Sequence, residues 1–300
     1  MNMRHDVTQT ENGWMLLKVL RDTLRLSNTL VKRLKRSRGV FLNGQTGFVR
    51  TRVQTGDVVE VMLEEHVDNN HLFPRDLSLR ILFEDDHLIA LDKPPGLLVH
   101  PSGPRREDTC LNGLKHHFLL SGARVVPRPV GRLDRQTSGV VVFAKNAHVH
   151  ALMIQTMKRP ESVKKYLGLV RGVPREDGGT MDFPIGRAGD SIILRMVAED
   201  GKPSRTRYRV LERYKDASLL EFNLESGRTH QIRLHCQAMG FPLLGDGLYG
   251  EEKPSPIIHR PALHACESSF IHPLTGERVT ICAPLPPDMA LALERLGLGT

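Results

Sequence analysis

Short apolar runs bounded by polar residues form the main pattern of the chain from residue 79 onward. Runs of this length predict buried strands; the clearest lies at residues 140–144, and others lie at 79–83, 87–91 and 167–170. Strands and short helices alternate irregularly, without a Rossmann or P-loop glycine pattern. The pattern therefore predicts an α+β fold built on a mixed sheet.

One helix is predicted near the amino terminus. Ser27 or Asn28 can cap its first turn, and Gly39 can end it. Its apolar positions at helical spacing are Leu30, Val31 and Leu34. Its outer face is predicted to carry Lys32, Arg33, Lys35 and Arg36.

A small hairpin and a linker are predicted after this helix. A strand at residues 40–42 enters an Asn43-Gly44 turn, which favours a tight hairpin, and a second strand follows at 58–63. Residues 65–78 are polar and include Pro74, so they predict a linker. We therefore expect a small domain over residues 1–70 and a large domain over residues 75–300.

Composition narrows the class of protein. The chain has 300 residues, 40% of them hydrophobic, which is enough to build a core. No apolar run approaches the roughly 20 residues of a membrane span, and the first residues lack the apolar core of a signal peptide. Four widely spaced cysteines without a CxxC pair fit a reducing compartment. We expect a monomeric cytoplasmic protein with no membrane partner.

The formal net charge of +8 comes from one segment. Residues 18–52 hold ten basic residues and a single acidic one, so this segment alone accounts for the surplus. A local patch of this kind favours a polyanionic partner such as RNA. The alternative is a solvated helix face with no ligand.

Asp134 is the strongest candidate for a reactive group. It lies in the run GRLDRQTSG at residues 131–139, immediately before the predicted strand at 140–144, where a rigid element can orient it. We expect the flanking Arg132 and Arg135 to place positive charge beside this carboxylate.

Five stretches of the chain together resemble the RluA-type pseudouridine synthases. GRLDRQTSG is similar to the signature of that family, with Gly131 where the family usually has His. The other stretches occur in the family's order: LDKPPGLLVHPSG from residue 91, KKYLGLVRG from 164, SGRTHQIRLHCQAMGFPLLGDGLYG from 226, and ALHACESSFIHPLTGE from 262. The resemblance implies a pseudouridine synthase fold with a mixed, largely antiparallel central sheet.

The resemblance also implies the chemistry. It implies an isomerase that converts uridine to pseudouridine in ribosomal or transfer RNA, without a metal, redox cofactor or nucleotide. Asp134 matches the family's catalytic carboxylate, Tyr166 matches the tyrosine of its KxY element, and Arg233 matches the arginine that pairs with the aspartate. Arg132 and Arg228 are expected to bind the RNA, whereas His230 and Gln231 are expected to be structural.

The amino-terminal segment resembles the S-four-like RNA-binding module of ribosomal proteins. This likeness implies that Lys32, Arg33, Lys35 and Arg36 contact RNA phosphates. Two further stretches, residues 93–96 and 245–250, are interpreted as scaffold forming the walls of the cleft.

Two other functions are compatible with parts of the pattern. One is a catalytically inactive RNA-binding or ribosome-assembly factor, which the intact set of Asp134, Tyr166 and Arg233 disfavours. The other is a glycoside-type hydrolase with paired carboxylates, which is disfavoured because the pattern assigns Asp134 no acidic partner.

Overall fold

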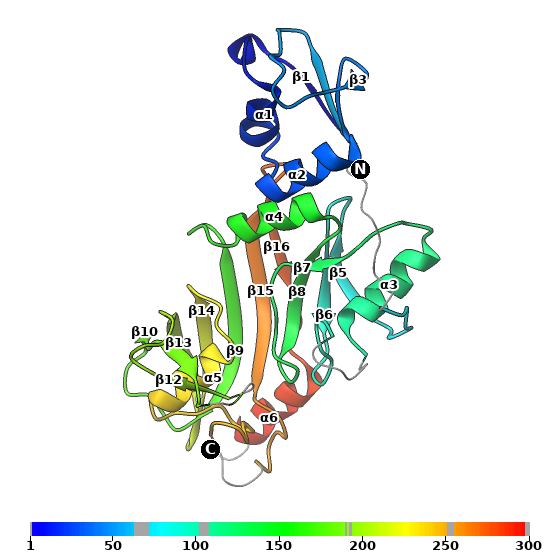
Figure 1. The fold of residues 1–300 in the computed structure, drawn as a ribbon. Coiled ribbons are helices and arrows are strands. Elements are labelled where there is room, and N and C mark those ends of the chain that lie inside the picture. Colours follow the sequence, from blue (N-terminus) through cyan, green and yellow to red (C-terminus); the bar gives the residue numbers. More distant parts are fainter. Residues whose placement is uncertain are drawn as a thin grey trace.

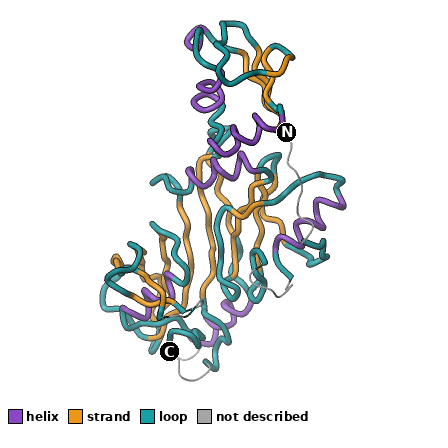
Figure 2. The backbone as a smooth tube through the Cα atoms, viewed as in Figure 1, coloured by secondary structure: helices purple, strands orange, loops and turns teal. Residues whose placement is uncertain are grey.

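Two sheets with separate hydrophobic cores organise the computed structural model (Figures 1 and 2). The structure describes residues 2–62, 72–101, 108–189, 191, 194–250 and 255–297. The amino-terminal sheet lies at the end of the molecule near α4 (Ala147–Thr156), and α6 (Pro287–Gly297) lies at the opposite end (Figure 1).

The amino-terminal sheet has four antiparallel strands in the order β1-β4-β2-β3. These are β1 (Asn2–Asp6), β2 (Val40–Leu42), β3 (Gln45–Thr46) and β4 (Val58–Met62). Helical segments cover the sheet: a 3-10 turn (Gln9–Glu11), α1 (Leu16–Lys18), a π-helical turn (Val19–Thr23) and α2 (Asn28–Ser37). The sequence pattern predicted neither β1 nor the helical turns before α2.

The predicted basic helix is α2, with one correction at its end. Ser27 is the cap, and its hydroxyl accepts a hydrogen bond from the backbone N–H of Leu30 at 3.2 Å. The left-handed residue that ends the helix is Arg38, with φ of 54°, and not Gly39. Gly39 is needed for a different reason, because a Cβ there would lie 2.9 Å from the carbonyl oxygen of Met62.

The strands and the turn predicted after α2 are present, but the strand across the turn is β3, which the sequence pattern did not predict. Asn43 and Gly44 both have positive φ, 52° and 76°, and form the two-residue turn between β2 and β3. The second predicted strand is β4, and its last predicted residue, 63, lies outside the described residues. Residues 65–71 of the predicted linker also lie outside them, and residues 72–78 have no regular structure.

The larger sheet has ten strands and is antiparallel except where β15 meets β8. The order is β10-β13-β14-β9-β15-β8-β6-β5, with β16 added to β15 and β7 to β8. The bounds are β5 (Arg80–Glu84), β6 (Leu88–Lys93), β7 (Arg128–Pro129), β8 (Ser138–Ala144), β9 (Val163–Arg171), β10 (Gly178–Asp182), β13 (Arg205–Arg213), β14 (Ala217–Leu224), β15 (Leu263–Ile271) and β16 (Arg278–Cys282). A separate two-stranded sheet joins β11 (Ile185–Arg187) to β12 (Arg195–Val197). The predicted α+β fold with a mixed, largely antiparallel sheet is confirmed.

Helices cover both faces of the larger sheet because its central strands are apolar on both sides. Alternate residues of β8, such as Val140 and Val142, pack with α4, whereas Val141 and Phe143 pack with α3 (Cys110–Leu120). On β9, Tyr166 and Val170 share a core with α5 (Gln231–Ala238), and Leu169 belongs to the core that includes α6. This burial on both faces explains why residues 140–144 form a continuous apolar run.

The contact between β8 and β15 requires a glycine at position 139. Gly139 has φ of +106°, and a Cβ there would lie 2.2 Å from the carbonyl oxygen of Ala265 on the facing strand. We expect Gly139→Ala to destabilise the protein by about 2–3 kcal/mol, because it combines backbone strain with overpacking.

Chemical denaturation can measure this loss. Gly131→Ala is the matched control, because a Cβ at residue 131 would meet no atom within 4 Å among the described residues. Its effect is expected to stay within about 0.5 kcal/mol. Equal stability of the two variants would show that the β8–β15 contact accommodates a side chain.

Candidate functional site

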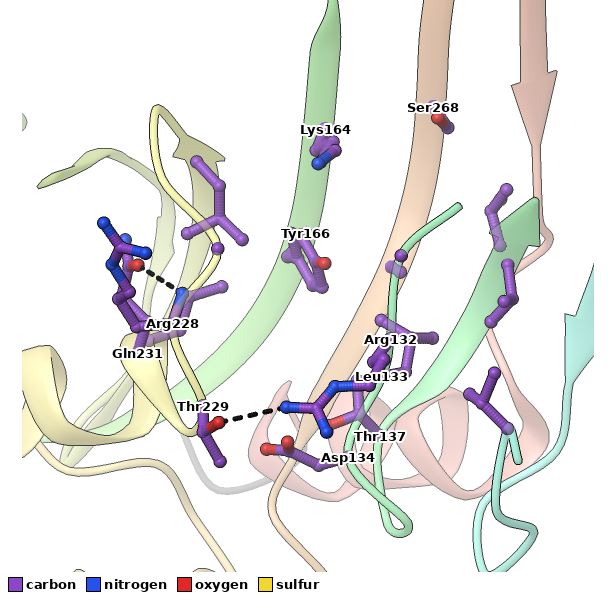
Figure 3. Close-up of a pocket in the computed structure, with 18 of the residues that line it drawn as sticks. Arg132, Leu133, Asp134, Thr137, Lys164, Tyr166, Arg228, Thr229, Gln231 and Ser268 are labelled. Atoms are coloured by element: carbon purple, nitrogen blue, oxygen red, sulfur yellow. Dashed lines mark hydrogen bonds between the residues drawn. The ribbon is translucent and has the colours of Figure 1, made fainter. Parts of the chain in front are cut away.

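A cleft of about 750 Å³ opens on the face of the larger sheet that also carries α4 and α5 (Figure 3). Its floor is formed by β8, β9 and β15, and its two sides by residues 130–135 and 224–233. Asp134, Tyr166, Arg233, Arg132 and Arg228 all line it, so the fold brings together residues that are far apart in the sequence. The four cations of α2 are absent from the described lining.

Asp134 lies in the loop before β8, with 25% of its side chain exposed. Its carboxylate faces two residues of the segment that starts α5: Oδ2 is 3.7 Å from Arg233 Nη1, and Oδ1 is 3.9 Å from His230 Nε2. The flanking arginines donate hydrogen bonds to other groups, Arg132 to the Thr229 hydroxyl at 3.2 Å (Figure 3) and Arg135 to the carbonyl of Gly96 at 2.9 Å. Asp134 thus faces the Arg233 guanidinium of α5 and the imidazole of the residue that caps that helix.

Arg233 is held in place by a second carboxylate. Its Nε and Nη2 donate to Oδ2 and Oδ1 of Asp246 at 2.7 and 2.6 Å, and both side chains are buried. Burial acts to lower the pKa of Arg233, but the hydrogen bonds and charge of Asp246 outweigh it and raise that pKa. The third nitrogen, Nη1, is the one that faces Asp134.

The glycine-rich loop at residues 245–250 supports this arrangement, which corrects its interpretation as a cleft wall. The backbone N–H groups of Leu248 and Tyr249 donate to Asp246 Oδ1 at 3.1 and 3.2 Å. The ring of Tyr249 lies 4.9 Å from the guanidinium carbon of Arg233. Asp246 was not predicted as a site residue, although it is the acidic residue of the GDGLYG run in a stretch that resembles the family.

Tyr166 lies on β9 and faces the cleft, between Asp134 and Lys164 near the start of that strand (Figure 3). Only 9% of the residue is exposed. Burial and the negative charge of Asp134 raise the pKa of its phenol, so the hydroxyl remains protonated at neutral pH. The aromatic ring is therefore available as an apolar surface that carries one polar group.

His230 and Gln231 have different positions relative to the carboxylate. His230 has φ of 59°, its Nδ1 is 2.7 Å from the hydroxyl of Tyr249, and burial lowers its pKa. Gln231 is buried with its amide satisfied, accepting from the backbone N–H of Arg228 at 3.0 Å (Figure 3) and donating to the Thr206 hydroxyl at 3.0 Å. Gln231 thus shapes the turn before α5, while His230 reaches the Asp134 carboxylate.

A buried lysine fixes the loop that carries Asp134. Lys93 is fully buried, and its ammonium donates to the carbonyls of Pro94, Leu97 and Arg135 at 2.8, 2.9 and 3.0 Å. Burial lowers the pKa of Lys93 to about 8. The turn at residues 93–96 therefore anchors the Asp134 loop, and it is not among the residues lining the cleft within the described chain.

A buried arginine fixes the same loop from the other side. Arg260 Nη1 donates to the carbonyl of Gln136 at 3.1 Å, and its Nη2 donates to the Ser138 hydroxyl at 3.3 Å. Asp288 of α6 accepts from Arg260 Nε at 2.6 Å. The carboxy-terminal helix is thereby connected to the residues that follow Asp134.

Neither a metal-binding cluster nor a helix able to span a membrane is present among the described residues. No group of three or more His, Cys, Asp or Glu side chains there is arranged to hold a metal ion. No described helix combines the length and apolar character needed to span a bilayer.

The comparisons with known proteins agree on one family. Residues 87–238 match the family model described as RNA pseudouridylate synthase. The chain is 38% identical to "Uncharacterized RNA pseudouridine synthase YlyB" of Bacillus subtilis, over 97% of this chain and 92% of that protein. It is 36% identical to "Ribosomal large subunit pseudouridine synthase D" of Zymomonas mobilis, over 97% of this chain and 96% of that protein.

Solved structures are similar over the larger part of the chain. "Human RNA Pseudouridylate Synthase Domain Containing 1" superposes with a TM-score of 0.58 at 28% identity, covering 71% of this chain and 87% of that one. "Human RNA Pseudouridylate Synthase Domain Containing 4" gives a TM-score of 0.61 at 23% identity, covering 73% and 93%. At that lower identity the likeness concerns the fold.

Proposed function

This chain belongs to the RNA pseudouridine synthases, a family of isomerases that act on RNA, and from that membership we propose that it converts specific uridines of ribosomal or transfer RNA to pseudouridine with Asp134 as catalytic carboxylate. The observation that carries the proposal is the position of Asp134, in a cleft, beside an arginine that a second buried carboxylate holds fixed. The names of several relatives, which refer to the large ribosomal subunit, favour ribosomal RNA.

The reaction breaks the bond from the ribose C1′ to the uracil N1, turns the detached base, and joins C1′ to C5. The C5–H bond then breaks with loss of its proton, and N1 takes up one proton, so the product is an isomer of the substrate. Asp134 is proposed to act on the ribose, either as a nucleophile at C1′ or as a base that removes a sugar proton. Arg233 is proposed to keep the carboxylate oriented, since its Nη1 is 3.7 Å away. No atom is added or lost overall, so the proposal includes no cofactor.

Tyr166 is proposed to bind the base. Enzymes that act on one base of an RNA take it out of the stack, and an aromatic ring in the pocket then replaces its stacking partners. Arg132 and Arg228, both exposed at the rim of the cleft, are proposed to contact the RNA backbone around the extruded nucleotide.

We propose two functional domains. Residues 75–300 would form the catalytic domain, and residues 1–70 an S-four-like RNA-binding module. On α2, Lys32, Lys35 and Arg36 are exposed and Arg33 is partly exposed, which leaves their charges available to RNA phosphates. The enzyme is proposed to act as a cytoplasmic monomer, which size-exclusion chromatography with light scattering can test.

A variant of α2 tests the proposed module. Replacing Lys32, Arg33, Lys35 and Arg36 by Gln is expected to weaken RNA binding and to flatten its salt dependence. Each lost phosphate contact lowers the slope of log K against log salt by about 0.7–0.9. Filter binding at several salt concentrations measures this slope.

Lys215→Gln is the control, because Lys215 is an exposed cation on the turn between β13 and β14. An unchanged slope in the α2 variant would mean that the basic helix is only a solvated face.

Two other functions were compatible with the sequence, a glycoside-type hydrolase and a catalytically inactive RNA-binding factor. The hydrolase alternative needs a second available carboxylate, but both oxygens of Asp246 accept hydrogen bonds from Arg233. Two other acidic residues of the described lining are also ion-paired, Glu225 with Arg207 at 2.6 Å and Glu267 with Lys165 at 2.9 Å. The inactive RNA-binding factor remains the competing function, and it predicts binding without product.

The deciding experiment compares RNA from cells with and without this gene. Pseudouridines are mapped by carbodiimide-dependent stops of reverse transcriptase. We expect stops to disappear at one or a few sites and to return with the wild-type gene but not with Asp134→Asn. An unchanged map, once redundant enzymes are excluded, would favour the RNA-binding factor.

A further inference from the structure

The cleft continues past Tyr166 to an end that the proposed chemistry does not use. Lys164 lies on β9 beyond Tyr166, and Ser268 lies beside it on β15 (Figure 3). Successive residues on one face of a strand are about 6.8 Å apart, so Lys164 is about one nucleotide unit from the tyrosine. The wall at this end comes from β8 and from the carboxy-terminal part of α4, with Lys158 at the mouth.

Lys164 has no acidic partner among the residues that the structure describes. Its side chain is partly buried, and no hydrogen bond or ion pair of its ammonium is found among the described residues. Burial is the cause that lowers its pKa. The next residue, Lys165, differs in having an acidic partner, because its ammonium lies 2.9 Å from the carboxylate of Glu267. A desolvated ammonium without a partner costs free energy that an anionic ligand can return.

A β-bulge at Cys266 places Ser268 on the cleft side. In the register of β15 against β9, Ala265 faces Tyr166 and Ser268 faces Lys164, with Cys266 as the extra residue. In a regular strand, residues 265 and 268 would point to opposite faces, and the bulge makes them share one. Directly opposed residues have Cβ atoms about 4.5–5.5 Å apart, so the Ser268 hydroxyl and the Lys164 ammonium are within reach of one ligand.

We propose that Lys164 and Ser268 form a subsite for a phosphodiester group of the RNA strand, adjacent to the uridine that Asp134 acts on. This inference rests on the proposed function and adds a contact that fixes the strand on the side of the cleft away from Asp134. The ammonium supplies charge and up to three donors, and the hydroxyl supplies one more. The apolar wall of Val140, Val142, Ile154 and Met157 beside them offers a surface for the neighbouring ribose or base.

The test measures binding by the full chain carrying Asp134→Asn, so that bound RNA is not converted. The probe is a synthetic RNA fragment around a uridine mapped in the gene-deletion experiment. Adding Lys164→Met is expected to weaken binding roughly tenfold at low salt and to lower the salt slope by about 0.7–0.9. Lys164→Arg is expected to keep most of the affinity and the slope, and Ser268→Ala to weaken binding by roughly threefold. Lys215→Met, on an exposed turn, is the control and is expected to change neither quantity.

A second measurement identifies the ligand group. Phosphates on either side of the target uridine are replaced one at a time by uncharged methylphosphonates. At one position, the methylphosphonate is expected to weaken binding to the Asp134→Asn protein as much as Lys164→Met does. In the protein that also carries Lys164→Met, the same methylphosphonate is expected to cause no further loss. Additive losses, or an unchanged salt slope in Lys164→Met, would overturn the phosphate subsite.

Single-turnover rates, measured with Asp134 intact, distinguish a failure of the phosphate subsite from a failure of the proposed function. If Lys164→Met binds RNA normally but slows product formation, Lys164 acts on the base and the phosphate assignment is wrong. If the wild-type enzyme converts no uridine in ribosomal or transfer RNA, the proposed function fails and the subsite fails with it. An active wild-type enzyme whose Lys164→Met variant has unaltered binding overturns the subsite alone.

Discussion

Asp134→Asn is expected to reduce pseudouridine formation by at least about 10³-fold while leaving RNA affinity within about threefold. The amide has the shape of the carboxylate but lacks its charge, so it can neither attack the ribose nor accept a proton from it. The loop is held by Lys93 and Arg260 through backbone carbonyls and the Ser138 hydroxyl, and none of these contacts involves the Asp134 side chain. The fold is therefore expected to survive the change. Single-turnover assays with nucleoside analysis of the product measure the rate, and filter binding measures the affinity.

Asp216→Asn is a suitable control, because Asp216 is an exposed residue on the turn between β13 and β14. Its rate is expected to equal that of the wild type. Retention of turnover by Asp134→Asn would remove this residue from the mechanism. Loss of both rate and RNA affinity would instead indicate that the carboxylate organises the binding surface.

Asp246→Asn is expected to destabilise the protein by about 3–5 kcal/mol and also to impair catalysis. The change leaves the Arg233 guanidinium buried with its charge uncompensated, which is the most damaging way to break a buried ion pair. It also frees Arg233 to shift relative to Asp134, from which its Nη1 is now 3.7 Å away. Urea denaturation measures the free energy of unfolding, and the single-turnover rate at a temperature where the variant is folded measures the catalytic effect.

An exposed pair of the same type serves as the comparison. Arg205 and Asp182 approach to 2.6 Å, but their side chains are 52% and 51% exposed. Asp182→Asn is therefore expected to cost less than about 1 kcal/mol, because water screens and replaces the interaction. Similar losses for the two variants would contradict the buried character of the Arg233–Asp246 pair.

These two predictions describe one arrangement of charges. Asp246 fixes Arg233, Arg233 faces Asp134, and the loop that carries Asp134 is anchored at the carbonyls of Arg135 and Gln136. A site whose charged groups are fixed before the substrate binds does not need to reorganise during the reaction. The buried groups around Asp134 are consistent with such a site, although they cost stability when a partner is removed.

Local features of the chain were predictable where neighbouring residues alone determine the structure. Ser27 caps α2 because its own hydroxyl reaches the N–H of Leu30, and Asn43-Gly44 turns the chain because both residues tolerate positive φ. The strand β8 was predicted because a run buried on both faces must be apolar throughout. The strand β9 was predicted too short, since Val163 at its start is followed by two lysines, Lys164 facing the cleft and Lys165 paired with Glu267.

The sequence by itself determined the fold class, the strand and cap positions set by local chemistry, and the stretches that resemble one enzyme family. Only the tertiary structure decided which groups meet. It placed Asp246 against Arg233, made Lys93 an anchor of the Asp134 loop, and used the bulge at Cys266 to direct Ser268 into the cleft. The physical reason is that these contacts join segments far apart in the chain through the order and register of the sheet. Hydrophobic periodicity records which face of a strand is buried, but not which distant strand lies beside it.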